Sequence, residues 1–354
     1  MKILYTLIIS VFIFLNCLAG YHENFVFAKK MYQDKLYDEA VRIFEEVITE
    51  ARTSPEADES LYNIGTIYLL QEKYSEAESV FRRHLNGYPN SLFGEKSLNN
   101  LAISQYQQSK FSDALINFQL LIKTYPTTDS ANSSAKYIPL CFYKKEDFHN
   151  CILESEKLLE NYPQKETASQ ILLIQAQAYF KSNIFDKADS IINSLISDYP
   201  DTEARWEAVI IKTDFMKNQN NSTNITDFLT ESLQKKPPRR HEEIIRHELA
   251  VVYLNSAAYS EADSEFNLLI NKFNNSAQLD RYLIDAIKIK SKLNSFKEVI
   301  ELCNKHELVF KNSPLKNEKL YYHANALAKE GNHGDSAKII SEISATDSSR
   351  DLIF

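Results

Sequence analysis

The chain has 354 residues, of which 44% are hydrophobic and 25% are charged, an ordinary composition for a soluble protein. Six glycines and nine prolines are too few for a fold rich in strands and tight turns. The formal net charge of −8 argues against nucleic acid as the main partner.

The first residues have the pattern of a secretory signal peptide. Met1 and Lys2 precede an apolar run from Ile3 to Leu15, and Cys17-Leu18-Ala19 then supplies small residues for cleavage. This pattern predicts a signal peptide over residues 1–19, and therefore export. Two alternatives stay open: the run is retained as a membrane anchor, or Cys17 is lipidated after processing. Asn16 departs from the small residue that usually precedes a lipidated cysteine.

Five prolines recur at intervals of 37 residues, and tyrosine precedes the first four. They are Pro89, Pro126, Pro163, Pro200 and Pro237. A proline cannot continue a helix from its interior, because it lacks the N–H and clashes with the preceding turn. The fixed period therefore marks the boundaries of a repeated unit.

A small or apolar residue, here called the anchor, stands twelve residues before each proline, and the same spacing continues toward both ends. The anchors are Ala40, Ala77, Ala114, Cys151, Ala188, Ile225, Ala262 and Val299, and one residue late the spacing reaches Ala337. Aromatic residues recur three before and four after the anchor, which is helical spacing. Small residues such as Gly65, twelve before the anchor, let two helices approach closely. The pattern predicts an array of helix–turn–helix repeats.

The second repeat is the most complete copy, with Gly65, Tyr68, Tyr74, Ala77, Phe81 and Pro89. It resembles the tetratricopeptide repeat, a helix–turn–helix unit of about 34 residues. The resemblance covers roughly residues 21–345 and implies an all-α, right-handed solenoid of about nine repeats of 37 residues. The Tyr-Pro-x-(Ser/Thr) segments at 88–91, 125–128 and 199–202 are similar to repeats of bacterial envelope proteins. Among these are the outer-membrane assembly lipoprotein and the periplasmic cell-division coordinator of the Tol–Pal system.

The predicted organisation has five parts. They are the signal peptide at 1–19, an N-terminal array at 20–204, a degenerate repeat or hinge at 205–236, a C-terminal array at 237–345 and a tail at 346–354. Pro139 falls inside the first helix of the fourth repeat and predicts a kink or a late start. The polar stretch Lys217–Asn224 predicts an extended, mobile turn.

No catalytic motif is present in the sequence. It has no phosphate-binding glycine loop, no GxSxG and no HExxH, and the histidines are scattered. Cys141, Cys151 and Cys303 give neither a disulfide framework nor a zinc motif, so buried structural thiols are expected, with a Cys141–Cys151 bridge as the alternative. We expect no enzyme, no catalytic residues, no cofactor and no metal site.

A basic cluster surrounds Pro237 and consists of Lys235, Lys236, Arg239 and Arg240. One interpretation is a solvated turn between repeats. The other is a docking patch for an anionic partner or a lipid headgroup.

Resemblance to tetratricopeptide repeats also implies that the first helix of each repeat lines a concave, partner-binding face. Eight residues before the anchors lie Tyr32, Leu69, Tyr106, Tyr143 and Phe180, here called the apolar ladder. They predict a groove for an extended peptide or a partner helix. The alternative is that Tyr32 and Tyr106 take a core position, since Met31 and Gln105 occupy the usual tyrosine slot before them.

The predicted function is an exported scaffold that holds a protein or peptide partner, in envelope assembly or division. The expected location is the periplasm or the outer membrane, with membrane association through the N-terminal anchor or a lipid. The alternative is an accessory protein that binds peptidoglycan or an exported polysaccharide.

Overall fold

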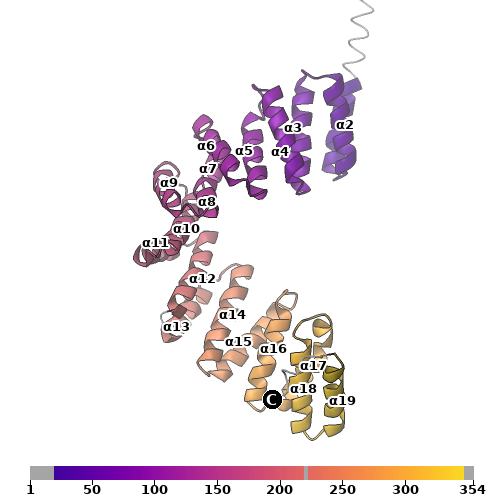
Figure 1. Ribbon diagram of the computed structural model, residues 1–354, viewed down its shortest axis with the longest axis vertical. Coiled ribbons are helices and arrows are strands. Elements are labelled where there is room, and N and C mark those ends of the chain that lie inside the picture. The colour runs from indigo at the N-terminus through magenta and orange to yellow at the C-terminus, as the bar shows by residue number, and fades with distance from the viewer. Residues whose placement is uncertain (1–19, 219–221, 347–354) are drawn as a thin grey trace, which may run out of the picture. The chain divides into compact units, whose positions relative to one another are not determined.

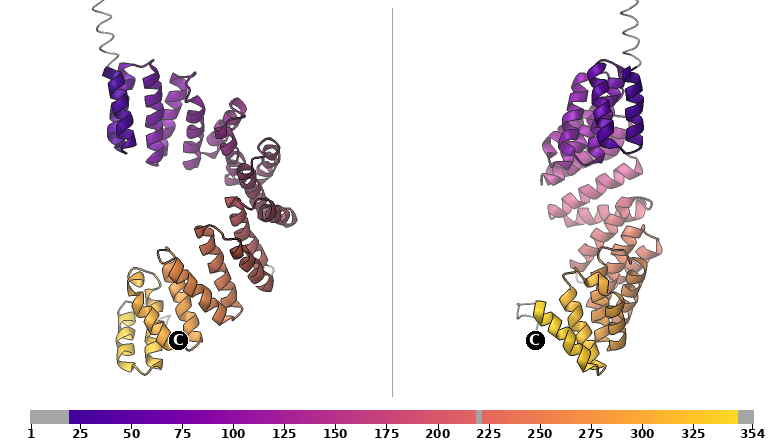
Figure 2. Two further views of the ribbon diagram at one scale, coloured as in Figure 1. Left: turned by 180° about the vertical axis from the view of Figure 1, so that it is seen from behind. Right: turned by 90° about the vertical axis from the view of Figure 1, so that its right-hand side faces the viewer.

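The computed structural model describes residues 20–218 and 222–346, and in these ranges every regular element is helical (Figure 1). Contacts divide the chain into two compact units, residues 1–205 and 206–354, with the boundary inside α12. Within each unit the helices form antiparallel pairs that pack side by side (Figure 2). The predicted all-α solenoid of tandem helix–turn–helix repeats is confirmed.

The first compact unit begins with a helix over residues 20–33. It continues with α2 (Tyr37–Glu50), α3 (Pro55–Leu70), α4 (Tyr74–Gly87), α5 (Gly94–Gln107), α6 (Phe111–Thr124), α7 (Asp129–Ser134), α8 (Tyr137–Lys144), α9 (Phe148–Asn161), α10 (Lys165–Lys181) and α11 (Phe185–Asp198), followed by α12 (Glu203–Asn218) across the boundary.

The second compact unit continues in the same way. Its helices are α13 (Ser222–Gln234), α14 (Arg239–Asn255), α15 (Tyr259–Lys272), α16 (Leu279–Lys292), α17 (Phe296–Lys305), the 3-10 helix η1 (Glu307–Phe310), α18 (Lys316–Lys329) and α19 (His333–Thr346). None of the helices in the described ranges has both the length and the apolar character needed to cross a bilayer.

The first helix of each repeat ends in the same way. The residue five before the anchor has a positive φ: Lys35, Glu72, Ser109, Glu146, Asn183, Ala257 and Asn294. Gly331, one 37-residue period after Asn294, has a positive φ too. Position 220, which completes this series, lies outside the described residues. In the second repeat the next amide, Lys73 N–H, donates to the Tyr68 carbonyl at 2.9 Å, which is the Schellman arrangement. This motif reverses the chain and sets the two helices antiparallel.

The anchors are the centre of the core. Seven of them are fully buried and Ile225 is nearly so, while Phe44, Phe81, Phe118 and Phe266 fill the space one turn later. The ninth anchor corrects the prediction, because Ala337 is exposed and Ser336 is the buried residue. Ser336 keeps the 37-residue register, and its hydroxyl donates to the Ala324 carbonyl at 2.8 Å, which satisfies the buried polar group.

The tyrosine and serine of the Tyr-Pro-x-Ser segment tie one repeat to the previous one. The Tyr88 hydroxyl donates to the Arg52 carbonyl at 2.7 Å, and the Ser91 hydroxyl donates to the Asp58 carboxylate at 2.7 Å. Six periods later, Ser313 donates to Asp280 at 2.6 Å. The segment at 88–91 therefore joins adjacent repeats, and the serine bond recurs at Ser313, whereas Thr128 and Thr202 bond locally to the carbonyls of Tyr125 and Tyr199.

Two expectations about irregular helices have different outcomes. The break expected near Pro139 is present, since α7 ends at Ser134 and α8 restarts at Tyr137. The range predicted for the extended turn, Lys217–Asn224, is longer than the break in the structure, because α12 includes Lys217 and α13 begins at Ser222. Residues 219–221, the centre of that stretch, lie outside the described residues, as do residues 1–19 with Cys17 and residues 347–354.

Candidate functional site

The apolar ladder lies along the first helices of the first five repeats. All five of its side chains are half-buried. First helices of consecutive repeats touch one another, α3 with α5 and α8 with α10. The ladder positions therefore recur along one side of the first compact unit, as the 37-residue spacing requires.

Each aromatic member of the ladder contacts the aromatic residue five positions later, across the turn. The ring centroids are 6.1 Å apart for Tyr32–Tyr37, 5.4 Å for Tyr106–Phe111, 5.6 Å for Tyr143–Phe148 and 6.3 Å for Phe180–Phe185. Both positions of each pair belong to the periodic pattern, but the pattern does not indicate that they touch. Two residues that are five apart on one helix do not lie on the same face. Here a positive-φ residue ends the first helix between them, and the turn brings the two rings together.

Tyr106 is the most enclosed of the ladder tyrosines in its contacts. Its ring also packs against Tyr137, with centroids 5.3 Å apart, and burial raises the pKa of its phenol to about 12. The structure therefore gives Tyr106 a packing role, as the alternative interpretation expected. Tyr143 and Phe180 have a packing contact too, with Phe148 and Phe185 respectively.

The basic cluster is partly occupied by contacts within the chain. Arg239 donates to the carbonyl of Lys272, the last residue of α15, at 2.9 Å, and its guanidinium lies 5.2 Å from the Phe273 ring centre. Arg240 lies 3.8 Å from the Glu207 carboxylate, and Lys235 lies 4.0 Å from Glu231. These contacts favour the structural interpretation for Arg239, because a cation at a helix C-terminus stabilises it.

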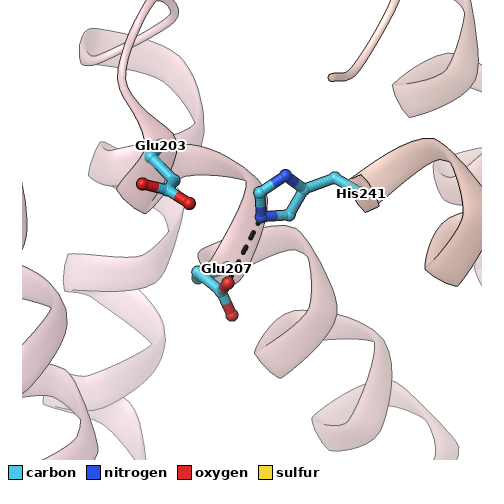
Figure 3. Close-up of side chains that lie close together, drawn as sticks. All are labelled: Glu203, Glu207 and His241. Atoms are coloured by element: carbon cyan, nitrogen blue, oxygen red, sulfur yellow. Dashed lines mark hydrogen bonds and ion pairs between the residues drawn. The ribbon is translucent and has the colours of Figure 1, made fainter. Parts of the chain in front are cut away.

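His241 and Glu207, both in the second compact unit, form a small polar cluster that the sequence did not indicate (Figure 3). His241 is 2% exposed, and its Nε2 lies 3.2 Å from a carboxylate oxygen of Glu207. Glu203 stands one helical turn before Glu207 on α12. Such side chains are metal ligands in other proteins, but Arg240 already supplies a positive charge to Glu207, so we assign the cluster a structural role.

The three cysteines of the described residues are free and buried. Burial raises the pKa of Cys141, Cys151 and Cys303 to about 12 in each case. Such thiols stay protonated at neutral pH and are poor nucleophiles. They serve as core residues, with Cys151 in the anchor position.

Comparison with known families agrees with this architecture. Residues 60–92 and residues 170–202 match family models described as tetratricopeptide repeat. These segments cover the second and fifth repeats. Each of these two segments therefore resembles a tetratricopeptide repeat, and repeats of this kind are protein-interaction scaffolds.

Many solved structures share this fold, and two of them cover most of the chain. A tetratricopeptide repeat protein from Parabacteroides merdae is 16% identical, with a TM-score of 0.51, over 75% of this chain and 97% of that one. The C-terminal part of a TPR repeat-containing protein from Cytophaga hutchinsonii is 14% identical, with a TM-score of 0.51, over 73% of this chain and 98% of that one. At these identities the likeness concerns the fold. A search of curated proteins found no match.

Proposed function

We propose that the chain is a non-catalytic scaffold that binds a protein or peptide partner along the apolar ladder of its first compact unit. The observation that carries this proposal is a half-buried apolar side chain at the same position in five consecutive repeats. Because adjacent first helices touch, these side chains offer a line of apolar contacts to an extended or helical segment.

Tyr143 and Phe180 are the central residues of the proposal. They belong to consecutive first helices, α8 and α10, which contact one another. Aromatic anchors in such grooves contribute on the order of 2 kcal/mol each when truncated. Loss of both rings is therefore expected to abolish capture of a partner of ordinary affinity.

The test compares two double variants with the unmodified chain in pull-downs from membrane extract, with bound proteins identified by mass spectrometry. Tyr143→Ala with Phe180→Ala removes both rings. Tyr143→Leu with Phe180→Leu keeps apolar volume against Phe148 and Phe185, which limits the loss of packing. We expect the alanine pair to lose the partner and the leucine pair to bind it weakly, while circular dichroism shows that both are folded.

A matched control removes exposed apolar side chains from the same compact unit. Ile116 and Leu120 lie on the second helix α6 and are 62% and 47% exposed. Ile116→Ala with Leu120→Ala should leave capture unchanged. Equal loss in this control, or normal capture by the folded alanine pair, would contradict a binding role for the ladder. If the chain sediments with cell-wall material, and the Tyr143→Ala and Phe180→Ala substitutions do not change this, a polymer-binding protein is favoured instead.

We further propose that the chain is exported and acts in the periplasm or at the outer membrane, in envelope assembly or division. The support is the apolar run after Lys2 and the Tyr-Pro-x-(Ser/Thr) segments. Mass spectrometry of the native protein should show a start near Gly20 or Tyr21, or a lipid on Cys17. An intact Met1 in the soluble cytoplasmic fraction would overturn export.

A further inference from the structure

A pocket of about 280 Å³ lies in the second compact unit, between η1, the first half of α18 and Glu342 of α19. Its walls include Lys311, Lys316 and Lys319 together with Leu308, Phe310 and Leu320. The three lysines are unevenly spaced in the sequence, where they resemble ordinary surface charges.

Lys319 is the unusual member of this group. Its side chain lines the pocket although the residue is only 2% exposed. Within residues 20–218 and 222–346, its ammonium group has neither a hydrogen bond nor an ion pair. A buried ammonium without a counter-charge is costly, so buried lysines are normally paired. The contrast within this unit is Lys290, 5% exposed, which has ion pairs with Asp263 and Glu298.

The neighbours of Lys319 do not supply that counter-charge. Burial raises the pKa of Cys303 and lowers that of His323, and the charge of Lys319 acts on both groups as a smaller, lowering influence, so a thiol and an imidazole lie near it. The carboxylates of Glu307 and Glu342 also line the pocket, but neither is within ion-pair distance of Lys319. Lys311 and Lys316 are exposed, and Lys316 begins α18, whose N-terminal end carries partial positive charge.

The remaining wall of the pocket is apolar. Leu308 is 84% exposed, whereas Phe310 and Leu320 are buried beneath it. An exposed leucine beside a cationic pocket fits a ligand that carries both an acidic group and an apolar group. The volume is sufficient for one or two side chains of a peptide.

We propose that this pocket binds an acidic side chain of a protein partner, with its carboxylate on the Lys319 ammonium and an adjacent apolar residue on Leu308. The inference rests on the proposed scaffold function and adds a second contact site with a defined chemistry. A carboxylate is favoured over a phosphate because Glu307 and Glu342 line the same pocket and repel a doubly charged group more strongly.

The test uses two acetylated and amidated peptides, Gly-Ser-Asp-Leu-Phe-Gly and its counterpart with asparagine in place of aspartate. Binding to the full chain is measured by calorimetry, and inorganic phosphate is titrated as a competitor. We expect the aspartate peptide to bind about tenfold more tightly than the asparagine peptide, since a charge-assisted hydrogen bond is lost. Phosphate should displace neither peptide.

Two variants locate the effect. Lys319→Met should bind both peptides equally and should melt at the same or a higher temperature, because it removes an unpaired buried charge. Lys319→Gln serves the same purpose if the methionine variant does not fold. Lys329→Met, at the exposed opposite end of α18, should keep the tenfold preference.

Equal affinity of the unmodified chain for the two peptides, or no binding of either, would overturn the proposal. Displacement by phosphate would show a site for small anions and would overturn it too. The ladder variant with Tyr143→Ala and Phe180→Ala should still bind the aspartate peptide. If the peptide test fails while the unmodified chain still captures its partner through the ladder, only the role of this pocket is rejected. If every ladder variant still captures the partner, the proposed function is rejected instead.

Discussion

The close approach of α3 and α4 depends on a missing side chain at Gly65. A Cβ atom built there would lie 2.7 Å from Cε1 and 2.8 Å from Cζ of Phe81. Phe81 is fully buried, so its ring has no room to move away. The same pair of positions appears in the periodic pattern of the sequence, as a small residue twelve before the anchor and an aromatic four after it.

Gly65→Ala should therefore destabilise the chain by about 1–3 kcal/mol, the usual cost of overpacking a core. The measurement is urea denaturation followed by circular dichroism. Gly87→Ala is the matched control, because Gly87 ends α4 and a Cβ there meets nothing within 4 Å. Equal stability of the two variants would show that the core accepts a methyl group at Gly65.

A substitution at Ala257, the positive-φ residue between α14 and α15, tests the backbone conformation of the turn. Its φ of 59° is in the left-handed region, which costs an L-residue roughly 1 kcal/mol relative to glycine. Ala257→Gly should raise the free energy of unfolding by about 0.5–1 kcal/mol. The neighbouring Ala258 has a φ of −79°, so Ala258→Gly should be neutral or destabilising. Destabilisation by both changes would contradict this reading of the turn.

At the scale of elements, residues of adjacent repeats that face one another match in polar or apolar character. The position nine residues before the anchor, here called the tyrosine slot, faces the residue just after the anchor of the previous repeat. In two repeats an aromatic residue in the slot shares a core cluster with the apolar residue after the previous anchor: Tyr68 with Val41 and Phe142 with Leu115. Where the slot is polar, the facing residue is acidic: the Gln105 amide donates to Glu78 at 3.2 Å and the Lys290 ammonium lies 2.8 Å from Asp263.

This pairing predicts non-additive mutations at Lys290 and Asp263. Lys290→Met alone strands a partly buried carboxylate, and Asp263→Val alone leaves the buried ammonium with only the exposed Glu298. Each should cost about 2–3 kcal/mol, whereas the double variant restores an apolar pair and should be more stable than Asp263→Val alone. Urea denaturation measures all three. Simple addition of the two single effects would contradict the pairing.

Glu78 predicts a pH dependence. Burial raises the pKa of its carboxyl, but hydrogen bonds from Lys110, Gln105, Arg82 and Gln108 outweigh it and lower the pKa from 4.5 to about 2. The folded state thus binds a proton less readily than the unfolded chain. Its stabilisation is present above pH 4.5 and is lost as the pH falls toward 2.

The corresponding variant is Glu78→Gln. It should be less stable than the unmodified chain at neutral pH, and the difference should shrink as the pH falls from 4.5 toward 2. Urea denaturation at a series of pH values measures this difference and cancels the titration of the other carboxylates. A difference that stays constant over this range would show that the charge of Glu78 does not stabilise the stack.

At the scale of the whole molecule, stability is built up by neighbouring repeats, because each repeat contacts only the next. A fragment of residues 20–204, which ends at a repeat boundary, should fold alone and unfold cooperatively in urea. A fragment of residues 20–181 ends between α10 and α11 and exposes buried residues such as Ile171, so it should be less stable. Equal stability of the fragments, or an unfolded longer fragment, would contradict repeat-by-repeat stabilisation.

The sequence by itself determined the repeat, its period and its core positions. Proline recurs where repeats end because it cannot continue a helix, and small residues recur where two helices approach closely. Both patterns can therefore be recognised in the sequence alone. The single anchor that was misplaced, Ala337 instead of Ser336, shows the limit of this reasoning. A serine can occupy a core position when a carbonyl accepts its hydrogen bond, and the Ala324 carbonyl that does so is visible only in the folded chain.

Only the tertiary structure decided which side chains meet. The aromatic pairs of the ladder depend on a turn residue with positive φ, a conformation that lysine, glutamate, serine and asparagine all adopt here and that their identities do not reveal. The burial of Lys319, and its lack of an ion pair among the residues that the structure describes, depend in turn on how η1 and α18 pack with their neighbours, which the sequence does not give. Periodicity places residues on a helix face, and packing between helices decides what each face touches.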